Sequence, residues 1–584
     1  MYERTGNLVK KKFMEYLLPT ILTSMAISLA SVVDGIIVGN LLGDMALAAV
    51  GLAGPVIFCI NMIYMLFGVG GLTCASIARG KREEGKSNLI FTLTIVFGMA
   101  AMMLFLVVMQ IFLVPISGML AGGDPVLTSM TADYLRPLLF TGPALMFSSG
   151  MALFIRTDGR PKSSAMVLIV ANVVNLLLDY VLIRFLNTGI AGAGISTTAG
   201  YVVGTVIVIP YLLSKNRSFR FARLGKGSIS VLGDILKTGF PKALYQICNF
   251  LRSLILNSII ISVLGSIGMS VMTVCVNVLM LSNIFVGGVS DALLPIVGTL
   301  FGERDYYGIR QSMKSAYIVL AIACTALIAF FMITPQTMGI AFGITSAEGM
   351  AAVIPALRLF AVYLPFDAMI QLLQNFYTTT DRKTIASIMV FMNGLLFIVL
   401  YAFLFATINA SLLWLCYACS GATTLAMIAV VSIGIRKREQ VKGILLLREQ
   451  NEIGIKHDIT INATTDEAVG LSDQLIGLCT QSGLSDLLAN HVGIAVEEMA
   501  ISTIHYAHKD KKKGIIDIML LITEANLTIR FRDNGVLFNP VEYIADEDDG
   551  CITDGIALIK KMASGVDYAN QLGFNTTVIS FDIK

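Results

Sequence analysis

The sequence predicts an α-helical membrane protein with twelve transmembrane helices in two six-helix lobes, followed by a C-terminal α+β sandwich domain. The chain has 584 residues, of which 56% are hydrophobic and only 14% are charged, whereas soluble globular proteins contain about 25% charged residues. Long apolar runs, such as residues 89–116, supply the ~20 residues that a helix needs to cross a bilayer. Segments of the apolar region also recur along the chain, and after residue 440 the composition becomes that of a soluble domain.

The internal repeat is clearest in two places. The segment FIRTDGRPK (Phe154–Lys162) returns as FYTTTDRK (Phe376–Lys383), and Pro19 has its counterpart in Pro241, both at an offset of 222 residues. A duplicated hydrophobic chain forms two lobes around a central cavity, which is the layout of a transporter. The predicted domains are an N-terminal lobe (1–222), a C-terminal lobe (223–440), a linker (441–454) and a soluble cytoplasmic domain (455–584).

The apolar runs must be helices, because a bilayer cannot hydrogen-bond exposed peptide groups. No signal-peptide cleavage pattern accompanies the first run, so we expect it to remain as the first helix. The twelve predicted spans lie near residues 13–40, 46–78, 88–115, 128–157, 163–186, 190–213, 232–264, 268–300, 313–342, 349–379, 384–406 and 409–434.

Basic residues gather in alternate loops, beginning with Lys10–Lys12 before the first span and ending with Arg436–Arg438 after the last. The other loops, such as 116–127 and 335–350, carry almost none. The positive-inside rule then places both termini and every basic loop in the cytoplasm, as in a multi-pass protein of a prokaryotic cytoplasmic (inner) membrane. Arg184, near the outer end of the fifth span, departs from this pattern.

Few ionisable or amide side chains lie at membrane depth, where charges are costly. Asp34 lies in the first span, and Asn172, Asn175 and Asp179 lie on one face of the fifth because their spacing is i, i+3, i+7. Thr197 lies on the sixth span. Such a set of oxygens can hold Na⁺ or share a proton. The alternatives are a capping or interfacial role for the carboxylates and helix–helix hydrogen bonding for the amide and the hydroxyl.

The second half carries different polar residues within its spans. Asn393 is retained in the counterpart of the fifth span, but no carboxylate stands where Asp179 would repeat. Any cation site is therefore expected in the first half. The polar residues of the second half include Asn249, Arg252, Asn257, Asn277, Asn283, Asp291, Asp367 and Gln371.

Metal and redox chemistry are not expected from the cysteines and histidines. Cys416 and Cys419 form a CxxC, but it lies within an apolar helix without a partner pair. All four histidines lie in the soluble tail without ligand spacing to cysteines, so no structural metal is expected. The net charge of +3 gives no reason to expect a nucleic-acid partner.

The tail after residue 455 mixes helical and strand patterns, which predicts an α+β sandwich. An Asp-Asn-Gly turn beginning at Asp533 follows a predicted strand, and Gly555 is expected at the start of a helix, where backbone N–H groups can receive phosphate. The predicted strands are 515–522, 527–533 and 577–583, and the predicted helices are 492–508 and 556–563.

Five segments of the first half together resemble the multidrug and toxic-compound extrusion (MATE) family. They are Val33–Gly43, Ala78–Lys86, Arg156–Lys162, Asn172–Ile183 and Gly189–Tyr201. The resemblance implies a Na⁺- or H⁺-coupled antiporter that is embedded in a lipid bilayer and expels bulky amphipathic, often cationic, compounds by alternating access. It also implies a cation site formed by Asp34, Asn175, Asp179 and Thr197. The carboxylates that another branch of the family carries in its second half have no convincing counterparts here.

The tail resembles the ATP-binding domain of histidine kinases and anti-sigma-factor serine kinases (the GHKL type). The resemblance implies that Glu498 matches the acidic residue of the first motif, that Asp533 with Gly535 recognises adenine, and that Gly555 belongs to the phosphate loop. Ser502 stands where the family has an asparagine that holds Mg²⁺. The sequence Thr553-Asp554-Gly555 also brings a negative charge toward the phosphates. Binding of ATP with Mg²⁺, serine kinase activity and binding of a cytoplasmic regulatory protein all stay open.

The leading hypothesis is a cation-coupled exporter with a cytoplasmic regulatory domain. One alternative keeps the fold but transports a lipid-linked or polar metabolite, for which Arg252 would be the main basic residue within a span. Another alternative is a membrane receptor that signals through its C-terminal domain.

Overall fold

The computed structural model describes residues 4–225, 227–341, 344, 346–441, 443–447, 454–508, 514–543 and 551–583. The chain forms two structural units, each described here by itself. The first consists of Met1–Met14, Tyr306–Gln311 and Arg448–Lys584, and the second of Glu15–Asp305 and Ser312–Leu447.

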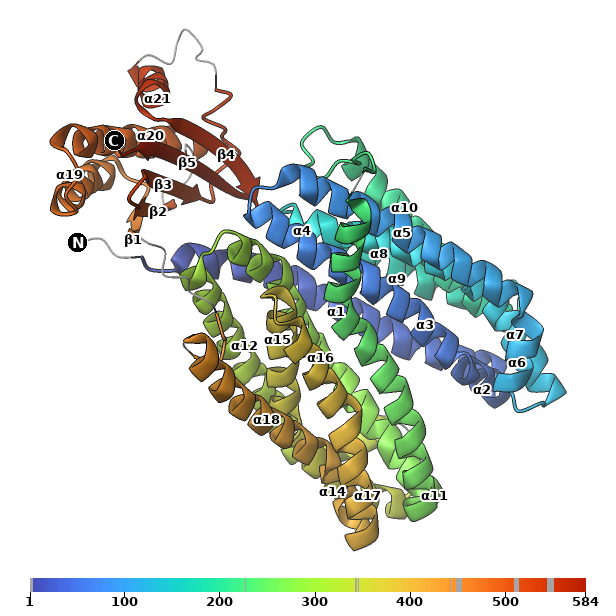
Figure 1. Cartoon of the computed structure of the whole chain (residues 1–584). Coiled ribbons are helices and arrows are strands. Elements are labelled where there is room, and N and C mark those ends of the chain that lie inside the picture. The colour runs from blue at the N-terminus through green and yellow to red at the C-terminus, as the bar shows by residue number, and fades with distance from the viewer. Residues whose placement is uncertain are drawn as a thin grey trace. The chain divides into compact units, whose positions relative to one another are not determined.

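The second unit is entirely helical and has two halves, drawn blue to cyan and green to orange in Figure 1. The helices of the first half are α1 (Asn7–Leu42), α2 (Asp44–Leu52), α3 (Gly54–Tyr64), α4 (Gly70–Gly80), α5 (Glu84–Ile111), α6 (Leu113–Leu120), α7 (Pro125–Leu138), α8 (Thr141–Thr157), α9 (Pro161–Arg184) and α10 (Ile190–Leu213). A π-helical turn at Met65–Val69 joins α3 to α4, so these elements form one long span.

The second half repeats this order. Its helices are α11 (Ser228–Gly302), α12 (Tyr306–Ile333), α13 (Pro335–Ala341), α14 (Ala347–Ala361), α15 (Leu364–Thr379), α16 (Lys383–Phe391), α17 (Phe397–Ile408) and α18 (Cys416–Glu439). The backbone of α11 breaks at Gly265, whose φ of 62° and ψ of −153° are not helical, so this element contains two spans.

The predicted twelve-helix membrane fold is confirmed. In the described residues, eleven helices are long and apolar enough to cross a bilayer, and the number is twelve if α14 and α15, bent by 42°, count as one span. The two halves contact each other mainly where α4 packs against α11. Figure 1 shows the halves close together around α4 and farther apart around α2 and α14.

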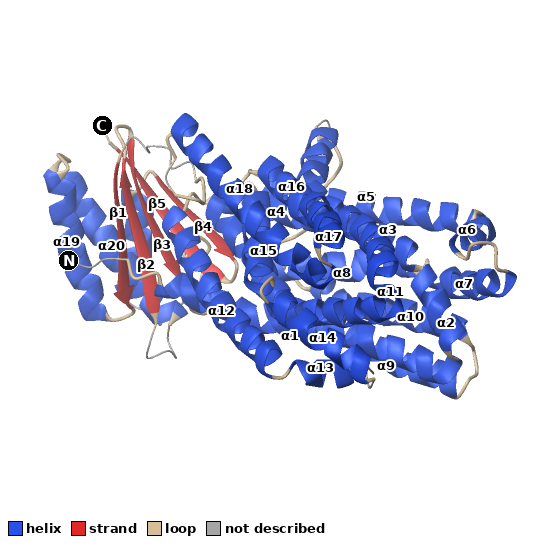
Figure 2. Cartoon of the chain, turned by 90° about the horizontal axis from the view of Figure 1, so that it is seen from below, coloured by secondary structure: helices blue, strands red, loops and turns tan. Residues whose placement is uncertain are grey.

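The C-terminal domain is a five-stranded antiparallel sheet with helices, as predicted for a GHKL-type domain. The strands are β1 (Ile455–Asn462), β2 (Ile515–Ile522), β3 (Asn526–Asp533), β4 (Gly565–Gln571) and β5 (Phe574–Asp582), in the order β1-β2-β3-β5-β4. The helices are α19 (Thr465–Gln481), α20 (Asp486–Ala507) and α21 (Cys551–Met562). Figure 2 shows α19 and α20 beside the sheet, and their apolar faces form one core with it.

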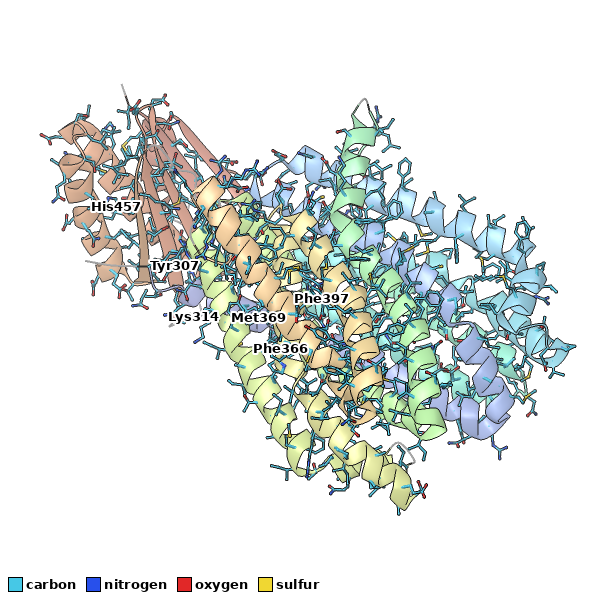
Figure 3. All side chains as sticks on the ribbon, turned by 60° about the horizontal axis from the view of Figure 1, so that its bottom comes forward. Tyr307, Lys314, Phe366, Met369, Phe397 and His457 are labelled. Carbon is cyan, nitrogen blue, oxygen red and sulfur yellow. The ribbon has the colours of Figure 1, made fainter. Side chains whose placement is uncertain are left out.

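The first residues of the chain fold together with this domain. Arg4, only 8% exposed, forms ion pairs with Asp458 of β1 at 3.6 Å and Asp517 of β2 at 3.4 Å. The backbone N–H of Thr5 donates to the Thr460 hydroxyl at 3.1 Å. Tyr307, labelled in Figure 3, donates its hydroxyl proton to the Arg4 carbonyl at 2.8 Å. The unit therefore contains the beginnings of α1 and α12 as well as the tail.

Candidate functional site

A polar cavity of about 220 Å³ lies inside the first half. Helices α1, α3, α7, α8, α9 and α10 supply its walls, so it belongs to one lobe only. Its polar lining residues are Ser31, Asp34, Asn61, Tyr134, Thr141, Asn172, Asn175, Thr197 and Tyr201.

Two carboxylates meet beside this cavity. Asp34 comes from α1 and Asp179 from α9, and their carboxyl groups lie close to each other. Asp179 is fully buried, and its Oδ1 accepts a hydrogen bond from the Ser196 hydroxyl of α10. Two carboxylates this close together in a buried site require a positive charge or a shared proton between them.

Three oxygen atoms of this cluster are buried without a hydrogen-bond partner: Asp34 Oδ1, Asn175 Oδ1 and Asp179 Oδ2. Asn175 uses its amide nitrogen to donate to the Thr197 hydroxyl at 3.1 Å, which leaves its carbonyl oxygen available. Partnerless buried oxygens are costly in a protein interior. Carboxylate and amide oxygens are also the ligands that hard cations prefer, so the cluster fits a small cation or a proton.

Close packing of α9 and α10 brings these side chains together. A Cβ on Gly200 would overlap the Ala171 carbonyl and lie 3.1 Å from the Asn175 Cβ, so only glycine permits this approach. Gly204, one turn further along α10, also faces α9. Small residues four positions apart commonly let two membrane helices approach each other, as here.

The four predicted cation-site residues, Asp34, Asn175, Asp179 and Thr197, thus lie around one cluster. Sequence reasoning missed Ser196, which directly precedes Thr197 and reaches Asp179. It also missed Asn61 of α3, which lines the cavity. The offset of 222 residues between Asn61 and Asn283, both within spans, was the available signal for Asn61.

In the C-terminal domain, Asp533 lies at the end of β3 and is almost completely buried. Its Oδ1 accepts hydrogen bonds from the Gly535 N–H at 2.7 Å and from the Asn575 amide at 3.1 Å, and His508 Nε2 lies 3.4 Å away. Its other oxygen, Oδ2, has no hydrogen-bond partner among the described residues. That oxygen can accept a proton from an exocyclic amino group such as that of adenine. No sequence pattern singles out Asn575 or His508.

Gly535 permits a close approach between this turn and the end of α20. A Cβ on Gly535 would overlap the Ala507 carbonyl, and the Val536 N–H donates to the same carbonyl at 2.8 Å. Beside it, the ring of Tyr506 stacks on Phe538 with centroids 4.9 Å apart. The turn is therefore held rigidly next to Asp533.

The expectation that Gly555 begins a helix is wrong, because α21 begins at Cys551 and includes Gly555 in its second turn. A Cβ on Gly555 would overlap the Glu498 carboxylate and lie 2.8 Å from its Cδ. Gly555 thus permits tight packing of α21 against α20. The side chains of Thr553 and Asp554, which belong to the expected phosphate loop, lie outside the described residues.

Glu498 and Ser502 lie one turn apart on α20. Burial, and after it the neighbouring Glu497, raises the pKa of the Glu498 carboxyl above its usual range. The Ser502 hydroxyl is fully buried and has no hydrogen-bond partner. The adenine side of the site therefore fits a nucleotide, whereas a short, buried hydroxyl does not fit the role of an Mg²⁺-holding amide.

Eleven or twelve apolar spans among the described residues, arranged in two repeats with a partly polar cavity in the first, define a multi-pass membrane transporter. The MatE family model matches residues 19–181 and 241–404, one match in each repeat, and the chain belongs to this family. A second model, the histidine kinase-like ATPase domain, matches residues 461–581. The chain thus joins a MATE transporter to a C-terminal domain of the histidine kinase-like ATPase type.

Curated relatives are multidrug export proteins. The chain is 22% identical over 408 residues to the multidrug export protein MepA of Staphylococcus saprophyticus. The matched region covers 68% of this chain and 88% of that protein. It is 22% identical over 323 residues to MepA of Staphylococcus haemolyticus, covering 55% of this chain and 70% of that protein.

Solved MATE structures share the fold. An outward-facing multidrug resistance MATE family transporter of the MOP superfamily is 21% identical with a TM-score of 0.68, covering 75% of this chain and all of that one (100%). A mutant of the Vibrio cholerae MATE transporter VcmN is 17% identical with a TM-score of 0.69, covering 75% of this chain and 99% of that one.

Proposed function

We propose that this protein is a Na⁺- or H⁺-coupled antiporter that exports amphipathic or cationic compounds across a prokaryotic cytoplasmic membrane, with both termini in the cytoplasm. The observation that carries the proposal is the cluster of partnerless oxygens on Asp34, Asn175 and Asp179. The multidrug export proteins among the relatives support the class of cargo. The alternation of basic and uncharged loops supports the orientation.

The coupling follows from the cost of buried charge. When the cation is present, it neutralises the Asp34–Asp179 pair, and α1, α9 and α10 can pack tightly around it. When the cation leaves, the two carboxylates repel each other and favour a different arrangement of these helices. Export is driven if cargo and cation prefer opposite arrangements of the lobe, because each ligand shifts the equilibrium only by its differential affinity.

The test is cation-driven efflux in inverted membrane vesicles. We expect Asp34→Asn to reduce the efflux driven by a Na⁺ or H⁺ gradient by at least about tenfold, because losing one partner of a buried charged pair costs several kcal/mol. The matched control is Asp133→Asn, which changes an exposed aspartate on α7 of the same lobe. Unchanged efflux and unchanged cation dependence in Asp34→Asn would overturn the proposal.

We further propose that the C-terminal domain binds an adenine nucleotide and regulates transport. Asp533 would hold the adenine amino group through Oδ2, while Gly535 and Asn575 keep the carboxylate in place. A bound nucleotide would add the negative charge of its phosphates to the domain. Phosphoryl transfer is not part of the proposal, because Ser502 replaces the asparagine whose amide would hold Mg²⁺. The domain could also dock a cytoplasmic regulatory protein.

In this proposal, the effect of the nucleotide reaches the transporter along the polypeptide chain itself. Arg4 is ion-paired to β1 and β2 of the domain, and the helix that begins three residues later, α1, carries Asp34. In proteoliposomes, we expect ATP on the side of the domain to change the transport rate of the intact chain but not of an Asp533→Asn variant. Equal rates with and without ATP, at saturating nucleotide, would remove the regulatory proposal and leave the antiport proposal standing.

The alternative of a lipid-linked cargo requires a basic residue that can bind the phosphate group of the cargo. Arg252, the main candidate, belongs to a buried network with Asp367 in the second lobe. Its charge is therefore already balanced within the protein, and we favour multidrug export.

A further inference from the structure

The second lobe contains a buried polar network that the proposed antiport does not use. Its centre is Asp367 on α15, which is only 8% exposed. The Asp367 carboxylate accepts hydrogen bonds from the Tyr363 hydroxyl at 3.1 Å and from the Gln371 amide at 2.9 Å. The Gln371 amide also donates to Asn283 of α11 at 2.8 Å, so two helices contribute to the network.

Arg252 on α11 is the positive charge of this network. Its guanidinium donates a hydrogen bond to Asn249 and lies 5.7 Å from the centre of the Tyr417 ring. The Tyr417 ring in turn packs against Tyr363 with centroids 5.4 Å apart, and Tyr363 donates its hydroxyl proton to Asp367. Two aromatic rings therefore connect Arg252 with Asp367 inside the lobe, without a direct ion pair among the described residues.

The network lies at the place in the second repeat that corresponds to the first-lobe cavity. The repeat offset of 222 residues, fixed by Pro19 and Pro241, relates each main member of the network to a residue of the first lobe. All four counterparts line the first-lobe cavity. The pairs are Arg252 with Ala30, Asn283 with Asn61, Tyr363 with Thr141, and Asp367 with Leu145.

The two equivalent places differ in one respect that matters for cation exchange. The first has two carboxylates, Asp34 and Asp179, and the protein supplies no positive charge among its lining residues. The second has one carboxylate, Asp367, and a guanidinium attached to the chain. A buried carboxylate in the low-dielectric interior of a membrane protein requires such a counter-charge.

We propose that Arg252 is a tethered cation, which permanently occupies in the second lobe the role that an exchangeable Na⁺ or H⁺ has in the first. The second lobe then keeps a constant charge throughout the transport cycle, and only the first lobe takes up and releases a cation. The repeat, symmetric in fold, becomes asymmetric in chemistry because Arg252 and Asp367 stand where the first lobe has Ala30 and Leu145. The comparison with the first lobe rests on the proposed function, but the charge balance of Asp367 does not.

The inference predicts that removing Arg252 creates a new cation site. The purified full-length chain carrying Asp34→Asn and Asp179→Asn, which silence the first lobe, is compared with the same chain carrying Arg252→Gln as well. Radioactive Na⁺ binding and proton uptake in weakly buffered solution are measured on both. We expect Arg252→Gln to add about one bound cation per molecule, as Na⁺ or as a proton, because the Asp367 charge loses its partner.

Two further variants make the result specific. Arg252→Lys keeps the positive charge and should add no cation, and Arg252→Gln combined with Asp367→Asn removes both charges and should add none. If Arg252→Gln binds no additional Na⁺ or proton while folded, the inference is overturned. If Arg252→Gln alone fails to fold, recovery of folding by Asp367→Asn supports the inference, and continued failure overturns it.

The same measurements separate this inference from the proposed function. Cation binding by the chain with an intact first lobe tests the antiport site, whereas the gain on removing Arg252 is measured in the silenced background. A chain that binds no cation through Asp34 and Asp179 but gains one without Arg252 would contradict the first proposal only.

Discussion

Gly80 and Gly302 meet where the end of α4 crosses the end of α11. A Cβ built on either glycine would lie 2.8 Å from the Cα of the other. It would also overlap a carbonyl oxygen, that of Thr299 for Gly80 and that of Ile77 for Gly302. The offset of 222 relates Gly80 to Gly302 and Ile77 to Thr299, so the contact is symmetric with respect to the repeat. It joins the two lobes at the ends of the spans that lead into basic loops.

Gly302→Ala should therefore disfavour the arrangement in which the lobes meet at this crossing. Overpacking by one methyl group costs about 1–3 kcal/mol, which corresponds to about a 5–150-fold change between two conformations. We expect slower transport and greater labelling of a cysteine placed near the crossing by a water-soluble reagent. Gly287→Ala is the matched control, because a Cβ there has no atom within 4 Å. Equal effects of the two substitutions would contradict a role for the crossing.

Ser196→Ala tests the geometry of the cation cluster without removing a charge. The Ser196 hydroxyl donates to Asp179 Oδ1 and so competes with a cation for the negative charge of the same carboxylate. A hydrogen bond to a charged group contributes about 1.5–3 kcal/mol, so its loss should tighten cation binding by about tenfold or more and slow cation release. Transport at saturating cation should fall.

The control for this change is Ser148→Ala in the same lobe, since Ser148 donates only to the backbone of its own helix. Cation affinity can be followed by the concentration that gives half-maximal efflux. Weaker cation binding in Ser196→Ala would show that the hydroxyl is itself a cation ligand and would contradict the competition.

The first-lobe cluster was largely predictable because carboxylates are rare within membrane spans. Helical periodicity alone places Asn175 and Asp179 on one face of a helix. The meeting of Asp34 with Asp179 across two helices could not be obtained from spacing, since it depends on how α1 packs against α9. Ser196 was missed because three adjacent hydroxyl residues of α10 look alike in sequence, and only the packing decides which one reaches the carboxylate.

The C-terminal domain shows where sequence patterns fail. Strand β2, whose buried and half-buried residues are almost all apolar, was predicted with its exact bounds, whereas β4 (GVDYANQ) is polar at most positions and was missed. Strand β1 and helix α19 were missed as well. The folding of Arg4 with β1 and β2 pairs residues more than 450 positions apart, and no local pattern indicates it.

Asp533→Asn should weaken nucleotide binding by the full-length chain. The change puts an amide next to the adenine amino group, and loss of a hydrogen bond to a charged acceptor costs about 1.5–3 kcal/mol, or about tenfold or more in affinity. A fluorescent ATP analogue titrated with and without Mg²⁺ gives the measurement. Asp473→Asn, at an exposed position of α19, is the control. Binding that survives Asp533→Asn would place the nucleotide elsewhere.

Glu498 gives the domain a pH dependence whose sign is fixed by its raised pKa. The folded domain holds this proton more tightly than the unfolded chain, so the free energy of unfolding falls as the pH rises from about 4.3, the unfolded value, through the folded pKa. Glu498→Gln should therefore stabilise the domain at pH 7 and leave its stability at pH 4 nearly unchanged. Amide hydrogen exchange of α20 and α21 in the full chain measures this. Glu524→Gln, at an exposed position, should leave the stability of the domain nearly unchanged at both pH values.

Arg4→Met should release the first residues of the chain from the C-terminal domain. The change removes one ion-pair partner of Asp517, a buried carboxylate of β2, and breaking a buried pair in this way costs about 3–5 kcal/mol. We expect faster proteolysis and faster amide exchange over residues 4–14, together with loss of any ATP effect on transport. Lys10→Met, an exposed position on α1, is the matched control. Adding Asp517→Asn to Arg4→Met also removes the carboxylate charge that Arg4 faces, and it should restore the stability of the domain, but not the ATP effect, if Arg4 is the connection between the domain and α1.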